Sequence, residues 1–122
     1  MTSAARPLPP WLTMTTEPVP AVVDGRACRT RAAFFDEVAR ALGLPAYFGH
    51  NWDALTDSLR DIGPVHLAVR HAEELLDGEP PGQFATLLAV LAGAAEAGLT
   101  LTLHTDPAHT PRLRHRLIDA LA

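Results

Sequence analysis

Three short apolar segments, each separated from the next by a helical pattern, constrain the fold of this 122-residue chain most strongly. They are residues 20–23, 65–69 and 99–104, and the last alternates Leu and Thr as a strand with one buried face does. Strands that are separated by helices usually pair in parallel, because each crossover returns the chain to the same end of the sheet. The sequence therefore predicts an α/β fold, with a three-stranded parallel sheet and helices packed on it.

Four longer helices are predicted between and after these strands. Thr30 can cap the first, in which apolar residues recur at spacings of three and four up to Leu42, before Gly43. Thr110 is the expected cap of the last, with Pro111 at its first helical position. The predicted helices are residues 30–42, 51–62, 83–97 and 110–121, with a short helix at 72–76 and a turn-rich connection at 77–82.

The chain length fits one domain with an extension at each end. Residues 1–19 are rich in Pro, Thr and Ser without a sustained period, so we expect a flexible N-terminal arm before a domain at 20–104. Residues 105–122 form the expected C-terminal helical extension. Cys28 is the single cysteine and is expected to be a packing residue. With neither a signal-peptide pattern nor an apolar stretch of membrane-spanning length, a cytoplasmic location without membrane contact is expected.

Negative charge is concentrated in the middle of the chain. The formal net charge is −4, yet residues 53–79 alone hold seven acidic residues and two arginines, a local charge of −5. A nucleic-acid-binding surface would be basic, so direct contact with nucleic acid is not expected. An acidic field of this kind attracts a basic protein partner.

The helix at 51–62 has two chemically different sides when it is drawn at 100° per residue. Its apolar side, which should face the core, holds Trp52, Leu55, Leu59 and Ile62. Its opposite side holds Asp53, Asp57 and Asp61. Like charges one turn apart cost about 0.2–0.5 kcal/mol per pair, and Arg60 is the nearby counter-charge. The row is therefore either an ordinary solvated face or a binding surface.

Residues 44–59, LPAYFGHNWDALTDSL, distinguish between these two interpretations. This stretch resembles the signature of the barstar family, the intracellular inhibitors of secreted microbial ribonucleases, and the resemblance extends over about residues 21–104. The matching residues are Leu44, Pro45, Tyr47, Phe48, Gly49, Asn51, Asp53, Ala54, Leu55, Asp57 and Leu59.

The resemblance implies a non-catalytic inhibitor that has no cofactor and no metal, and is a monomer when free. Its partner would be a small basic ribonuclease of the extracellular type, bound 1:1 through helix 51–62 and loop 44–50. Tyr47 would pack near the catalytic base of the enzyme, and Asp53 and Asp57 would pair with its cations, with Asp57 at an RNA phosphate position. The residues expected to contact the partner are Tyr47, Gly49, His50, Asn51, Asp53, Thr56, Asp57, Arg60 and Asp61.

Two departures from the family pattern affect the expected partner. Thr56 and Gly93 stand where the best-known member has a tryptophan and a glutamate. The scaffold could therefore serve as an immunity protein or a regulator with a different toxin partner.

Two other interpretations have less support from the residues. Asp53 and Asp57 could be the acid and base of a hydrolase, but an exposed helix face offers them no enclosing pocket. The six histidines do not follow a metal-ligand spacing.

Overall fold

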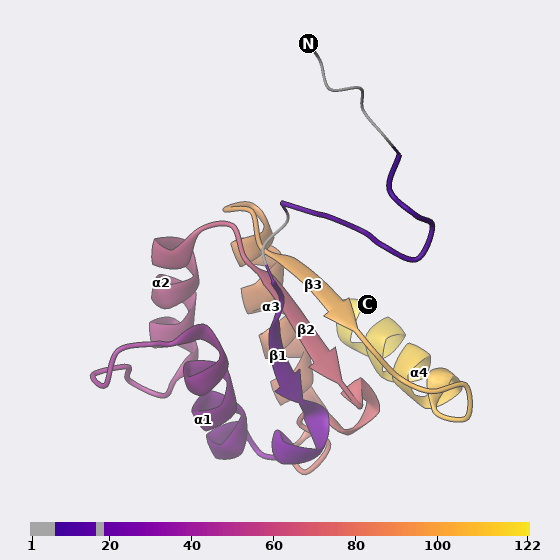
Figure 1. The fold of residues 1–122 in the computed structure, drawn as a ribbon. Helices are drawn as coiled ribbons and strands as arrows, with labels where there is room; N and C mark the ends of the chain where they lie inside the picture. The colour runs from indigo at the N-terminus through magenta and orange to yellow at the C-terminus, as the bar shows by residue number, and fades with distance from the viewer. Residues whose placement is uncertain (1–6, 17–18) are drawn as a thin grey trace.

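The computed structural model describes residues 7–16 and 19–122, which form a three-stranded sheet with helices (Figure 1). Residues 7–16 contain no helix or strand. The strands are β1 (Ala21–Asp24), β2 (His66–Arg70) and β3 (Thr100–Leu103). The helices are α1 (Arg31–Leu42), α2 (Trp52–Ile62), α3 (Pro81–Ala95) and α4 (Thr110–Leu121), with 3-10 turns η1 (Gly25–Ala27) and η2 (Ala72–Glu74).

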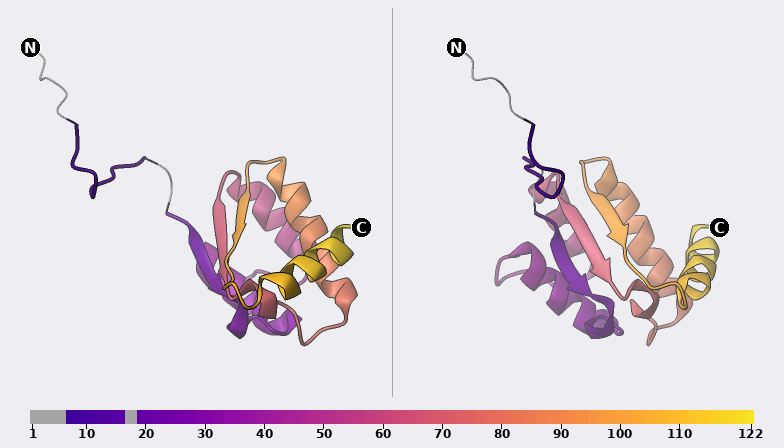
Figure 2. Two further views of the ribbon diagram at one scale, coloured as in Figure 1. Left: turned by 90° about the vertical axis from the view of Figure 1, so that its right-hand side faces the viewer. Right: turned by 45° about the vertical axis from the view of Figure 1, so that its right-hand side comes forward.

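The sheet has the order β1-β2-β3 and both strand pairs are parallel, which confirms the predicted fold class. Val23 is in register with Val69, and Val69 with Leu103. The helices lie to one side of the sheet (Figure 2). On the other side Val22 is 45% exposed, whereas Val23 next to it is completely buried. The hydrophobic core therefore lies between one face of the sheet and the helices.

Aromatic residues hold α2 against its neighbours. The half-buried Trp52 ring lies 4.9 Å from the Phe35 ring and 5.9 Å from the Phe34 ring of α1, measured between centroids. Trp52 Nε1 also donates a hydrogen bond of 3.2 Å to Gln83 Oε1 of α3. Leu55 and Leu59 are buried, as predicted. These contacts determine which face of α2 remains exposed to solvent.

Ile62 is a correction to the predicted core, because its side chain is 37% exposed. It is the last residue of α2, and Gly63 then takes a positive φ of 73° and donates its N–H to Leu59 O. The chain turns away at this point, so a favourable position on the helical wheel does not bury Ile62.

Two predicted helix starts and one predicted helix also differ from the structure. α3 begins at Pro81, because proline suits the first turn of a helix, where its missing N–H would have no partner. His109 occupies the cap position of α4, and Thr110 is its first residue, with Oγ1 donating to Asp106 O at 2.9 Å. The predicted short helix at 72–76 is the 3-10 turn η2.

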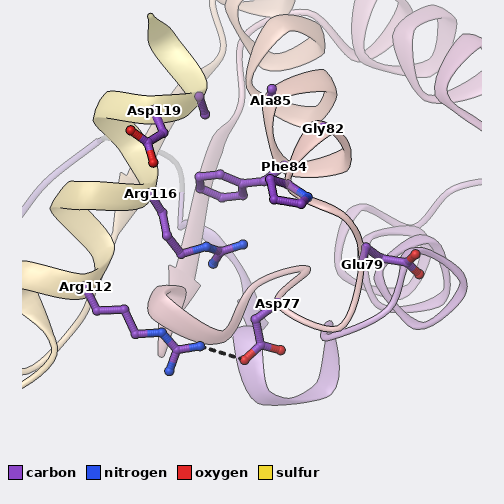
Figure 3. A pocket seen from close by; sticks show the side chains of 10 residues that line it. Asp77, Glu79, Gly82, Phe84, Ala85, Arg112, Arg116 and Asp119 are labelled. Carbon is purple, nitrogen blue, oxygen red and sulfur yellow. Dashed lines mark hydrogen bonds and ion pairs between the residues drawn. The ribbon is translucent and has the colours of Figure 1, made fainter.

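The C-terminal helix α4 folds back onto the acidic half of the chain. Arg112 Nη2 lies 2.9 Å from Asp77 Oδ2, and Arg116 Nη1 donates to the backbone oxygen of Glu73 at 3.0 Å. The Arg116 guanidinium lies 4.2 Å from the centre of the Phe84 ring of α3 (Figure 3). Leu113 is buried beneath α4. This helix therefore packs on the domain through both apolar and charged contacts.

Candidate functional site

The exposed face of α2 carries the acidic row Asp53, Asp57 and Asp61, as the helical wheel predicts. All three side chains are exposed, whereas Leu55 and Leu59 on the opposite face are buried. Within residues 7–16 and 19–122 none of the three carboxylates has a hydrogen bond or an ion pair. We call these residues the acidic row.

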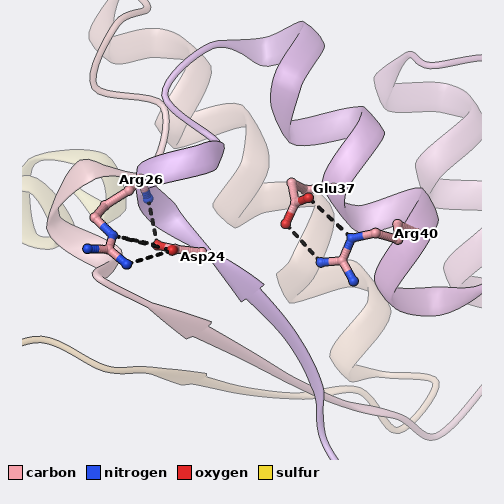
Figure 4. A network of polar contacts seen from close by, with 4 residues as sticks. All are labelled: Asp24, Arg26, Glu37 and Arg40. Atoms are coloured by element: carbon pink, nitrogen blue, oxygen red, sulfur yellow. Dashed lines mark hydrogen bonds and ion pairs between the residues drawn. The ribbon is translucent and has the colours of Figure 1, made fainter.

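Arg60 does not neutralise the acidic row within the chain. Its side chain is exposed and makes no ion pair with any residue that the structure describes. Acidic residues elsewhere behave differently, because Asp24 pairs with Arg26 at 3.0 Å and Glu37 with Arg40 at 2.9 Å (Figure 4). These local pairs lower the pKa of Asp24 and of Glu37, chiefly through hydrogen bonds from the arginines. The negative charge of α2 thus remains available to a partner.

The two aromatic residues of loop 44–50 differ in burial. Phe48 is buried, with its ring 6.1 Å from that of Phe35, and its N–H donates to Pro45 O at 2.9 Å. Tyr47, next to it, is 87% exposed. Phe48 therefore anchors the loop to the core, while the Tyr47 side chain remains exposed to solvent.

His50 connects this loop to α1. It has a positive φ of 50°, and its Nδ1 lies 2.8 Å from Phe48 O. Its Nε2 lies 3.2 Å from a carboxylate oxygen of Asp36. Asp36 was not among the predicted site residues, because its contact with the loop depends on tertiary structure and has no local sequence signal.

Asn51 and Gly49 shape the start of α2. The Asn51 side chain accepts a hydrogen bond of 2.8 Å from Ala54 N and donates one of 3.1 Å to Gly49 O. A Cβ added at Gly49 would lie 3.3 Å from Ala54 Cβ, so a larger residue would crowd this turn. Both residues therefore have an internal role, in addition to the contact with a partner that the sequence predicts.

Thr56 and Arg60 lie on the side of α2 that faces α3. Thr56 Oγ1 donates to Trp52 O at 2.9 Å, a bond within the same helix. Both residues line a hollow of about 260 Å³ that Gly93 also lines from α3. The structure therefore brings together the two positions at which the chain departs from the family pattern.

Two larger hollows lie away from the acidic row. One, of about 430 Å³, lies between α3 and α4 and is lined by Asp77, Phe84, Arg112 and Arg116 among others (Figure 3). The other, of about 470 Å³, lies on the open face of the sheet, where Val22, Ala68 and Arg70 line it. Neither is lined by any of the predicted partner-contacting residues.

The structure and the comparisons also address other classes of site. Across the described ranges, 7–16 and 19–122, no three His, Cys, Asp or Glu residues gather closely enough to hold a metal ion. In the same ranges no helix has both the length and the apolar character needed to cross a membrane. A comparison with curated proteins gave no match.

Comparison with protein families gave a match over most of the chain. The model of the family described as barstar (barnase inhibitor) matches residues 19–109, a range that contains all three strands, helices α1 to α3 and loop 44–50. This chain belongs to the barstar family.

Proposed function

We propose that this chain inhibits a small, basic, secreted-type ribonuclease by placing α2 and loop 44–50 in the active site of the enzyme. The observation that carries the proposal is the acidic row, whose three carboxylates have no partner within the described residues. Membership of a family of ribonuclease inhibitors supports the same conclusion.

The chemistry of the two surfaces is complementary. A ribonuclease stabilises a phosphate and its developing negative charge with cationic donors, so its cleft is positively charged. Carboxylates on a helix occupy more defined positions than carboxylates on a flexible loop. Forming charge-assisted hydrogen bonds to them therefore costs less conformational entropy. Asp57 is in the middle of α2 and is the carboxylate that we expect at the phosphate position.

The loop contributes a second kind of contact. Tyr47 is exposed next to a buried anchor residue, Phe48. Because Phe48 fixes the loop, placing Tyr47 against a partner costs little backbone conformational entropy. Aromatic residues presented in this way often dominate binding energy at interfaces. Tyr47 and the acidic row together form the surface that we propose binds the enzyme.

We further propose that the chain is a non-catalytic monomer that binds its partner 1:1 in the cytoplasm of the cell that makes the nuclease. Asp53 and Asp57 lie on the outside of a helix and line none of the three hollows described above, which argues against a hydrolase. The hollow at Thr56 and Gly93 favours a partner that differs from the best-known target of the family.

The proposal is tested by titrating the chain into barnase-type ribonucleases, including those from the same genome, while cleavage of a fluorogenic RNA is followed. We expect a linear loss of activity that ends at one inhibitor per enzyme. Asp57→Asn removes a charge but keeps the shape, and should raise Kd about ten- to 150-fold, since a hydrogen bond to a charged group contributes about 1.5–3 kcal/mol.

Asp119→Asn is the matched control, because it makes the same change in charge at an exposed position of α4. Its Kd should remain within about threefold of the original value. Inhibition that Asp57→Asn leaves unchanged would refute the proposed role of α2, and a chain that inhibits none of the ribonucleases would refute the proposed function.

A further inference from the structure

The hollow between α2 and α3 lies directly beside the acidic row. Arg60 is one turn after Asp57 on the same helix, and Thr56 precedes Asp57 in the sequence. At about 260 Å³ the hollow is smaller than the roughly 300–1,000 Å³ of small-molecule sites, so its size suits one protruding side chain. Its lining consists of Thr56, Arg60, Gly93, Ala94, Glu96 and Ala97.

Gly93 has no internal reason to be glycine. It lies in the last turn of α3, where glycine is less favourable for a helix than alanine. Its φ is not positive, and a Cβ added there would have no atom within 4 Å. Neither the backbone nor the packing of this chain requires glycine here, and its absence of a side chain leaves space that a group from outside the chain can enter.

The lining of the hollow includes one charge of each sign. Arg60 and Glu96 are both exposed, and the side chain of neither makes a hydrogen bond or an ion pair with another residue of the described part of the chain. The other lining residues are small, and the hydroxyl hydrogen of Thr56 already has its acceptor in Trp52 O.

These properties discriminate between the side chains that could enter. A cationic side chain would pair with Glu96 but leave Arg60 without a partner, an acidic one would do the reverse, and an aliphatic one would contact neither charge. A neutral amide could contact both charges but would bury little apolar area against Gly93, Ala94 and Ala97. An aromatic side chain with a donor satisfies both, because a guanidinium stacks on the ring face and the O–H or N–H donates to the carboxylate.

We infer that this hollow is a specificity pocket, which receives one Tyr or Trp side chain of the ribonuclease between Arg60 and Glu96. The inference rests on the proposed function and names a feature that the partner enzyme must have. Enzymes with such an aromatic residue beside the active site are bound, and those without it are bound more weakly.

The first test fills the pocket. Gly93→Leu places a side chain in the open space and should fold at least as stably, because leucine favours a helix more than glycine does. Ala92→Leu is the control, since Ala92 is exposed on the same helix but does not line the hollow. For the ribonuclease inhibited in the titration above, Kd should rise about tenfold or more for Gly93→Leu and stay within about twofold for Ala92→Leu.

The second test identifies the side chain that enters. Kd is measured for Arg60→Gln and Glu96→Gln at about 1 M salt. Each variant changes the net charge of the chain, and at this salt concentration a Debye length near 3 Å suppresses the long-range effect of that change on binding. An aromatic occupant with a donor predicts that each variant weakens binding about two- to fivefold. Tighter binding by Arg60→Gln would indicate a cationic occupant, and two unchanged values an aliphatic one; either result overturns the inference.

Failure of this inference is distinguishable from failure of the proposed function. If Gly93→Leu inhibits normally while Asp57→Asn is weakened, the pocket is refuted and inhibition through α2 stands. If the unaltered chain inhibits no ribonuclease, both are refuted.

Discussion

Replacing Asn51 with alanine tests how the chain positions α2. Asn51 Oδ1 accepts from Ala54 N at 2.8 Å, and its Nδ2 donates to Gly49 O at 3.1 Å. Loss of a helix cap costs about 1 kcal/mol, and the second, exposed hydrogen bond adds about 0.5 kcal/mol. We therefore expect Asn51→Ala to lower the free energy of unfolding by about 1.5 kcal/mol, and Tm by roughly 4–8 °C.

The assay is urea unfolding followed by circular dichroism and by tryptophan fluorescence. The fluorescence change reports on Trp52, which leaves its aromatic neighbours when the chain unfolds, because Trp11 is already 81% exposed in the folded chain. Asn51→Asp is the control, because its carboxylate still accepts from Ala54 N and its charge is favourable at a helix N-terminus. The aspartate variant should stay within about 0.5 kcal/mol of the original chain. Equal unfolding midpoints for Asn51→Ala and Asn51→Asp would refute the capping argument.

Three further predictions concern the loop, the contacts of α4 and the core. Tyr47→Ala should change the free energy of unfolding by less than about 0.5 kcal/mol, because the side chain is exposed. The same variant should raise Kd for the ribonuclease about tenfold or more. A loss of stability with an unchanged Kd would contradict this. Burial alone would raise the pKa of Asp77, but hydrogen bonds from Arg29 and Arg112 lower it below its usual value. The stabilisation from Asp77 is therefore complete above its unfolded pKa and is lost as pH falls through the lower, folded one. Asp77→Asn should make acid unfolding below the usual aspartate pKa of 3.8 less steep, and an unchanged profile would refute this. Burial raises the pKa of the Cys28 thiol to about 12. A thiol reagent at pH 8 should therefore label the native chain only at the rate at which the chain opens and exposes Cys28. Immediate labelling would contradict the burial of Cys28.

Local patterns predicted the fold and one face of the site because they depend on neighbouring residues. Thr30 and Asn51 cap their helices through their own side chains, so both starts were predictable. The exposed aspartates and the buried Leu55 and Leu59 follow from the helical period alone. Ile62 was mispredicted because the period does not indicate where a helix extends past its core contacts.

Contacts between distant segments could not be predicted in this way. Asp77 pairs with Arg29, 48 residues earlier, and with Arg112, 35 residues later, and neither spacing has a sequence signature. The hollow beside Thr56 depends on the distance between α2 and α3, which is a property of packing. Departures at Thr56 and Gly93 could be seen in the sequence, but their proximity could not.

Competition with a nucleic acid for the cleft of the enzyme tests most directly whether α2 occupies that cleft. Kd between the chain and its ribonuclease is measured at increasing concentrations of a non-cleavable 2′-deoxy oligonucleotide that binds the active site. Occupation of the active site predicts that the apparent Kd rises in proportion to the oligonucleotide concentration and that no ternary complex forms. An unchanged Kd, with the chain and the oligonucleotide bound to the enzyme together, would contradict the account.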